Sequence, residues 1–105
     1  MEANKYQKAA LRTASSVEPD DLILNGVLGL AGESGEVADH IKKHLFQGHA
    51  LNKEYLASEL GDICWYISIT AEGLGYTLGE IMQMNIEKLS KRYPDGFDSE
   101  RSINR

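Results

Sequence analysis

The sequence predicts a single all-α domain, and three observations lead to that prediction. Apolar residues recur at helical spacing along several stretches of the chain. The breaks between these stretches fall at proline and glycine, namely at Pro19, at Gly48 and in the Gly73–Gly75 segment. A chain of 105 residues has the length of one domain and can bury only a modest core.

The composition excludes several classes of protein. A formal net charge of −5 argues against binding to a nucleic acid polymer, which requires an excess of positive charge. The single cysteine, Cys64, excludes an internal disulfide and fits a reducing compartment. No apolar run approaches the roughly 18 residues of a transmembrane helix, and residues 1–5 lack the apolar core of a signal peptide. We therefore expect a cytoplasmic protein that has no membrane partner.

The first two helices are expected over residues 3–15 and about 20–46. The first has a thin apolar face, so we expect it on the outside of the fold. The second begins after Pro19 with two aspartates, which the helix dipole favours in a first turn. Its main apolar arc, expected to be core, comprises Leu24, Val27, Leu28, Ala31, Ala38, Ile41 and Leu45.

Three glycines, Gly26, Gly29 and Gly32, follow one flank of this second helix at intervals of three residues. Each costs roughly 1 kcal/mol relative to alanine in a helix interior. The repeated cost indicates that another helix or a ligand comes close to the backbone on this flank.

The third helix is expected over about 53–73, with Asn52 as its N-cap. Trp65 and Ile69 make it apolar on a second side, which is typical of a central helix or of a subunit interface. Its main apolar arc comprises Leu56, Leu60, Ile63, Cys64, Ile67 and Ala71.

The fourth helix is expected over about 78–92, beginning with a capping box formed by Thr77 and Glu80. Its expected core residues are Leu78, Ile81, Met82, Ile86 and Leu89. The single domain then spans residues 1–105, with its core at about 20–97 and an exposed tail at 98–105.

Two acidic pairs, Glu33 with Glu36 and Glu59 with Asp62, are the main candidates for chemistry. Residues three apart share one face of a helix, so antiparallel packing of the second and third helices would bring four carboxylates together. Such a cluster requires positive charge, and Mg²⁺ is the usual partner of grouped carboxylate oxygens. A solvated acidic face is the plainer interpretation of the spacing alone.

A polar row of Asn85, Lys88 and Arg92 lies on the margin of the fourth helix. An acidic cluster that faces such a cationic row suits a metal-bound polyphosphate. A ferritin-like di-iron site is excluded, because none of the histidines stands three residues after a glutamate.

These motifs, with their surroundings, resemble a known family. The acidic pairs are separated by 22 residues, and the first lies in the run Gly29-Leu30-Ala31-Gly32-Glu33-Ser34-Gly35-Glu36-Val37. The later segments Asn85-Ile86-Glu87-Lys88-Leu89 and Arg92-Tyr93-Pro94, with Gly96-Phe97, match as well. Over roughly residues 20–97 the chain resembles the MazG-like nucleotide pyrophosphohydrolases of the all-α NTP pyrophosphatase superfamily.

The resemblance implies a four-helix-bundle-type MazG-like fold, assembled as a dimer or a dimer of dimers. It implies hydrolysis of (deoxy)nucleoside triphosphates between the α and β phosphates, which gives the monophosphate and pyrophosphate, with Mg²⁺ or Mn²⁺ as cofactor. The implied metal-binding and catalytic residues are Glu33, Glu36, Glu59 and Asp62, and Glu36 is our first candidate for the base. The implied substrate-binding residues are Lys88 and Arg92 for phosphates, and Asn85 and Tyr66 near the substrate.

Two other functions stay open. One is a phosphoribosyl-ATP pyrophosphohydrolase of histidine synthesis, and the other is a noncatalytic helical module that binds a nucleotide or a partner. The preferred base and sugar, the number of metals and the choice between dimer and tetramer are not readable from the sequence.

The length of the second helix independently predicts an assembly. About 27 residues make a helix of about 40 Å, which exceeds the roughly 26 Å diameter of a compact 100-residue domain. A projecting amphipathic helix is most simply covered by a twofold mate. We therefore expect a homodimer or homotetramer whose interface contains apolar residues of the second and third helices.

Overall fold

A computed structural model describes residues 1–104 of the chain, most of which are helical. The predicted all-α class is confirmed, because this part of the chain contains no β-strand and only an isolated bridge between Pro94 and Gly96. None of its helices has the length and apolarity needed to cross a membrane. The helices are α1 (Ala3–Leu11), α2 (Pro19–Phe46), α3 (Lys53–Leu74), α4 (Leu78–Arg92) and α5 (Ser99–Ile103).

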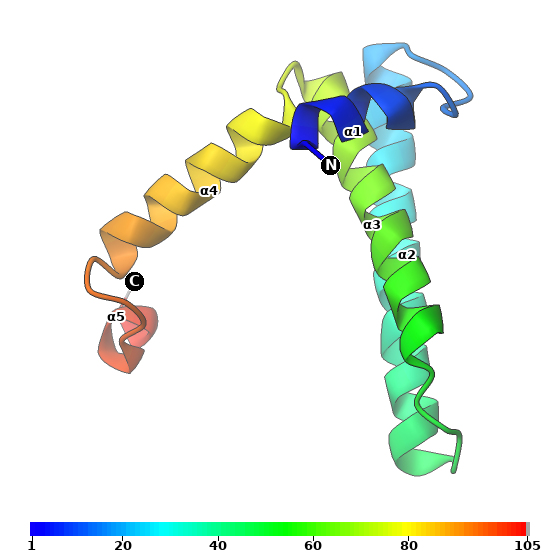
Figure 1. Cartoon of the computed structure of the whole chain (residues 1–105), viewed down its shortest axis with the longest axis vertical. Helices are drawn as coiled ribbons and strands as arrows, with labels where there is room; N and C mark the ends of the chain where they lie inside the picture. The colour runs from blue at the N-terminus through cyan, green and yellow to red at the C-terminus, as the bar shows by residue number, and fades with distance from the viewer. Residues whose placement is uncertain (105) are drawn as a thin grey trace.

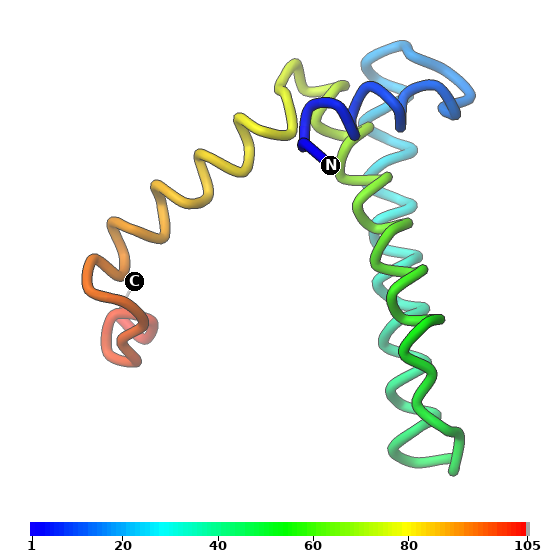
Figure 2. The backbone as a smooth tube through the Cα atoms, in the orientation of Figure 1, coloured from blue at the N-terminus to red at the C-terminus, as the bar shows by residue number. Residues whose placement is uncertain are grey.

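The helices form two arms rather than a closed bundle (Figure 1). Helices α2 and α3 run antiparallel as a long pair, α1 lies across one end of that pair, and α4 leads away from the same end. Figure 2 shows the same path, with α5 far from the loop that joins α2 to α3. The Cα radius of gyration is 16.6 Å, against about 13 Å for a compact domain of 100 residues. The predicted four-helix bundle is therefore not closed within one chain.

Glycines determine how closely α2 approaches α3. A Cβ atom at Gly29 would collide with the ring of Tyr66, and a Cβ atom at Gly26 would collide with Thr70. At these two positions the close approach predicted from the sequence is made by another helix. Gly32 differs, because nothing lies within 4 Å of the place where its Cβ would be.

The side of α2 that faces α3 is not the apolar arc predicted as core. Leu22 and Gly26 are the buried residues of this helix. Leu24, Leu28 and Leu45 of the predicted arc are 62%, 71% and 63% exposed. The prediction is wrong for a single chain because the glycine flank admits α3 at short range, and no other helix within residues 1–104 covers the opposite side. One chain thus leaves a long apolar surface on α2 exposed.

Helix α1 connects to the corner where α3 turns into α4. The buried Gln7 side chain donates to the Tyr76 carbonyl oxygen at 3.0 Å and accepts from the Leu78 N–H at 2.6 Å. Asn4 Oδ1 accepts a hydrogen bond from the Gly79 N–H at 2.8 Å. These bonds satisfy backbone donors in the first turn of α4, where a helix has no internal acceptors. The direction in which α4 leaves the corner is therefore fixed partly by α1.

The C-terminal part of the chain departs from the sequence expectation in two ways. No residue of α4 is buried, although five apolar residues were expected to be core. Helix α5 forms within the stretch expected to be an exposed tail, and most of its residues are indeed exposed. The Asp98 side chain caps α5 by accepting from the Glu100 N–H at 2.9 Å. The turn before it uses Gly96, whose φ of 94° is a left-handed conformation that favours glycine.

Candidate metal and phosphate sites

Three of the four predicted carboxylates meet between α2 and α3. Glu33 projects from α2, and Glu59 and Asp62 project from α3. One carboxylate oxygen from each residue lies within 4.8 Å of those of the other two. We call this group the acidic cluster.

Glu33 is the member with the most perturbed chemistry. Its Oε2 atom is buried and has no hydrogen-bond donor among the described residues. A hydrogen bond between Glu33 and Glu59 requires a proton on one of the two carboxyl groups. This bond, followed by desolvation and by the charges of Glu59 and Asp62, raises the pKa of Glu33 to about 7. In the absence of a cation, a proton therefore takes up part of the negative charge of the cluster.

The acidic cluster has the properties required to hold a divalent cation. The atoms that would bind the metal are carboxylate oxygens, which hard cations such as Mg²⁺ prefer as ligands. The unpartnered Oε2 of Glu33 is a buried acceptor in need of positive charge. A cation would replace the shared proton and satisfy this oxygen.

Glu36 lies outside the acidic cluster, beside Tyr55 of α3. The Tyr55 hydroxyl is 3.5 Å from Glu36 Oε2, and both residues line a hollow of about 260 Å³ with His40 and Lys43. Burial raises the pKa of Tyr55, and the negative charges of Glu59 and Glu36 raise it further. The Tyr55 phenol is thus a stable hydrogen-bond donor between the acidic cluster and Glu36.

Asp39, which follows Glu36 by three residues on α2, is engaged in ion pairs. Its two carboxylate oxygens lie 3.0 Å from Lys42 Nζ and 3.0 Å from Lys43 Nζ. Hydrogen bonds from Lys43 and Lys42 lower the pKa of Asp39. Asp39 is therefore neutralised locally and does not add to the charge of the acidic cluster.

Tyr66 and Trp65 lie next to the acidic cluster. With Glu33 and Asp62 they line a hollow of about 300 Å³. The Tyr66 ring packs on the backbone of Gly29, and Trp65 meets it edge-on with ring centroids 5.1 Å apart. The structure thus places Tyr66 beside the carboxylates, and its role near the substrate stays a prediction.

The Trp65 indole is held in place by α1. Its Nε1 donates to the Ala10 carbonyl oxygen at 3.1 Å and to the Thr13 hydroxyl at 2.9 Å. Trp65 therefore packs between α3 and α1 of the same chain, as in a central helix, while part of the side chain still lines the hollow.

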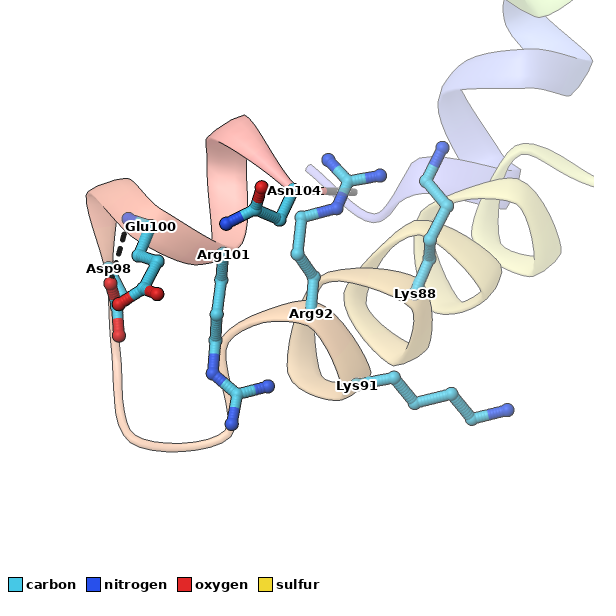
Figure 3. Close-up of a pocket in the computed structure, with 7 residues that line it drawn as sticks. All are labelled: Lys88, Lys91, Arg92, Asp98, Glu100, Arg101 and Asn104. Atoms are coloured by element: carbon cyan, nitrogen blue, oxygen red, sulfur yellow. Dashed lines mark hydrogen bonds between the residues drawn. The ribbon is translucent and has the colours of Figure 1, made fainter.

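The predicted cationic row lies on the other arm. Lys88 and Arg92 line a pocket of about 690 Å³ between α4 and α5 (Figure 3). Asn85 lines a different pocket of about 520 Å³, which it shares with Cys64, Ile67 and other mainly apolar residues. Since α4 leads away from the α2–α3 pair (Figure 1), one chain does not bring this row to the acidic cluster.

Sequence reasoning missed three residues of these sites, namely Tyr55, Lys91 and Arg101. Tyr55 stands four residues before Glu59 on the same helix, so its place beside the carboxylates was accessible from helical spacing. Arg101, in the pocket with Lys88 and Arg92, lies in the stretch read as a tail, where no periodic pattern indicated a site.

The class of this protein is defined by two antiparallel helices that bring a partly exposed acidic cluster together, and by a third helix that carries cations. It is an all-α protein whose acidic centre suits a divalent cation. The family follows from comparison with known proteins: the chain belongs to the family of the MazG nucleotide pyrophosphohydrolase domain, which matches residues 24–97. The family resemblance seen in the sequence is thereby confirmed.

A curated relative is similar over about two thirds of the chain. The chain is 37% identical over 73 residues to the Gene 37 protein of Mycobacterium phage L5. The matched stretch covers 66% of this chain and about 64% of the length of that relative. No solved structure matches the chain.

Proposed function

We propose that the protein hydrolyses (deoxy)nucleoside triphosphates between the α and β phosphates, releasing the nucleoside monophosphate and pyrophosphate. The family supplies the reaction class. The observation that carries the proposal is the acidic cluster, in which Glu33, Glu59 and Asp62 converge without any positive partner in residues 1–104.

In this proposal different carboxylates of the chain bind the metal and accept the proton. Glu33, Glu59 and Asp62 would hold Mg²⁺, or Mn²⁺ in its place, and the bound ion would supply Lewis-acid stabilisation of the phosphate charge. Glu36 lies outside this group, so its carboxylate can accept the proton of the attacking water, with the Tyr55 hydroxyl near its Oε2.

The remaining predicted residues bind the substrate in this proposal. Lys88 and Arg92 would stabilise the negative charge of the leaving pyrophosphate. Tyr66 lines the hollow beside the acidic cluster, where the rest of the nucleotide has room to lie. Asn85 precedes Lys88 by three residues, on the same face of α4.

The proposal includes assembly into a homodimer or a dimer of dimers. Two observations support it. The apolar arc of α2 is largely exposed in one chain, and a surface of that kind marks an interaction site. The cationic row also lies on a different arm from the acidic cluster (Figure 1), so a second copy would have to bring cations to each cluster.

The test is release of pyrophosphate with Mg²⁺ across a panel of nucleoside triphosphates, with Glu59→Gln and Glu54→Gln as matched variants. Both variants change a glutamate of α3, but Glu54 is exposed and lies outside the acidic cluster. We expect Glu59→Gln to lower turnover at least about 100-fold, the scale of a lost electrostatic group, and Glu54→Gln to leave it nearly unchanged. Equal turnover in the two variants would remove the acidic cluster from the mechanism.

A further inference from the structure

The pocket between α4 and α5 is lined mainly by charged residues. Its volume is about 690 Å³. Four cations line it, Lys88, Lys91 and Arg92 from the end of α4 and Arg101 from α5. Figure 3 shows Lys88 and Arg92 extending in the same direction from α4, Lys91 extending from α4 away from α5, and Arg101 extending from α5.

The charge of this pocket is opposite to that of the chain. The lining contains four cations and two carboxylates, Asp98 and Glu100, which leaves an excess of two positive charges, whereas the whole chain carries −5. Asp98 is already engaged as the cap of α5. Within residues 1–104 the ion pairs formed are those of Asp39, so no carboxylate of this region pairs with any of the four cations. Grouped like charges of this kind are relieved by an anion.

The pocket is built by a defined turn. Gly96, with its φ of 94°, reverses the chain after α4, and its N–H donates to the Tyr93 carbonyl oxygen at 3.2 Å. The rings of Tyr93 and Phe97 pack across the turn with centroids 5.4 Å apart. Arg92 lies over the Tyr93 ring, with its Cζ 5.9 Å from the centroid. Helix α5 is thereby returned to α4, and Arg101 is placed beside the cationic row.

We propose that α5 completes a binding pocket for a chain of linked phosphates, with Arg101 and Lys91 as phosphate-binding residues in addition to Lys88 and Arg92. Cations spread over two helices suit two or three linked phosphates better than one, and arginine is well matched to phosphate oxygens. The inference rests on the proposed function for the identity of the anion, which is the polyphosphate of the nucleotide. Arg101 lies outside residues 24–97, the part of the chain that the family matches.

The experiment is calorimetric titration of the full chain with inorganic tripolyphosphate in EDTA at low salt, so that no divalent cation bridges to the acidic cluster. The variants are Arg101→Gln, Lys91→Gln and the control Arg12→Gln, which removes the same charge from an exposed position at the end of α1. We expect Arg101→Gln and Lys91→Gln each to weaken binding at least about tenfold, as for a lost hydrogen bond to a charged group. The control should change it less than about twofold, and orthophosphate should bind far more weakly than tripolyphosphate.

The outcomes separate this inference from the proposed function. Tripolyphosphate binding that is absent, or equal in the wild type and Arg101→Gln, overturns the inference even if the protein hydrolyses nucleotides. Orthophosphate that binds as tightly as tripolyphosphate overturns it too. If no nucleotide is hydrolysed but Arg101→Gln loses tripolyphosphate binding, the pocket stands and the proposed reaction fails. Should circular dichroism show that Arg101→Gln has lost helix, Lys91→Gln, which leaves α5 unchanged, decides the matter.

Discussion

A proton and a metal ion compete for the Glu33 carboxylate. The affinity for the metal ion should therefore depend on pH near neutrality, which a glutamate with the usual pKa would not cause. The perturbation is a change of pH from 8 to 6, with Mn²⁺ as the ion and without nucleotide. The pKa of Glu33 in the metal-free protein is about 7, against an ordinary value of 4.5. Metal binding requires the ionised carboxylate, so the proton must leave before the ion can be held by this residue.

The size of the effect follows from the ionised fraction. With a pKa of about 7, Glu33 is about nine-tenths ionised at pH 8 and about one-tenth ionised at pH 6. The apparent Mn²⁺ affinity should therefore fall about tenfold between these two pH values. A glutamate with the ordinary pKa of 4.5 stays almost fully ionised over the same range and would give almost no change.

The assay is calorimetric titration with Mn²⁺ at pH 6, 7 and 8 and constant ionic strength, using the wild type and Glu33→Gln. Glu33→Gln should bind Mn²⁺ more weakly at every pH and should lose most of the pH dependence, because it carries no titrating group at this position. A wild-type affinity that is the same at pH 6 and pH 8 would refute the shared-proton account of the acidic cluster.

The same raised pKa should make the stability of the metal-free protein fall as the pH rises. The folded pKa of Glu33 is raised, so the folded state retains a proton that the unfolded chain releases. The stabilisation from this group is fully present below pH 4.5 and is lost as the pH rises to about 7. Thermal unfolding of the wild type and Glu33→Gln at both ends of this range measures the same titration without any metal.

Three other predictions concern packing, catalysis and assembly. Gly29→Ala forces a Cβ against the Tyr66 ring and should destabilise the fold by roughly 1–3 kcal/mol. Gly32→Ala, where nothing lies within 4 Å, should stabilise it by up to about 1 kcal/mol; the opposite order of melting temperatures would contradict the packing described. Glu36→Gln should lower turnover at least about 100-fold with helix content unchanged, and wild-type turnover at saturating Mg²⁺ would exclude Glu36 as the base. Dilution should reduce mass by light scattering and activity together; a fully active monomer would disprove the proposed assembly.

The helices themselves were largely predictable from local sequence. Helical spacing and end signals gave 20–46, 53–73 and 78–92 for elements that the structure places at Pro19–Phe46, Lys53–Leu74 and Leu78–Arg92. The capping box at Thr77 and the N-cap at Asn52 are both present. The first helix ends at Leu11 rather than at residue 15, and the residues after it form part of the attachment of Trp65.

The contacts between helices were less predictable, because apolar periodicity does not say which partner covers an apolar face. The bulky arc with Leu24 and Leu28 looked like the core, but α3 packs on the glycine flank, where Gly29 admits the Tyr66 ring. The shape of that interface depends on the close approach of two helix backbones, and the apolar periodicity of a sequence does not reveal such an approach.

The candidate site was predictable to the extent that it depends on helical spacing. Glu33, Glu59 and Asp62 meet as expected from antiparallel packing, and Tyr66 lies beside them. Glu36 is displaced from the cluster because the residues on α3 opposite it include Tyr55. The separation of Lys88 and Arg92 from the carboxylates depends on the direction of α4, which no local pattern encodes.

Because α4 projects from the corner, a small rotation at its first turn moves its far end by a large distance. Its 15 residues span about 22 Å at 1.5 Å per residue, and Lys88 and Arg92 sit near its far end. A rotation of about 10° at the corner moves the tip by about 4 Å over this length, more than the length of a hydrogen bond. The side chains of Gln7 and Asn4, which bond to the first turn of α4, therefore set the reach of cations that lie far from them. We therefore expect an affinity tag fused ahead of α1, or a substitution at Gln7, to change phosphate binding at the far end of α4.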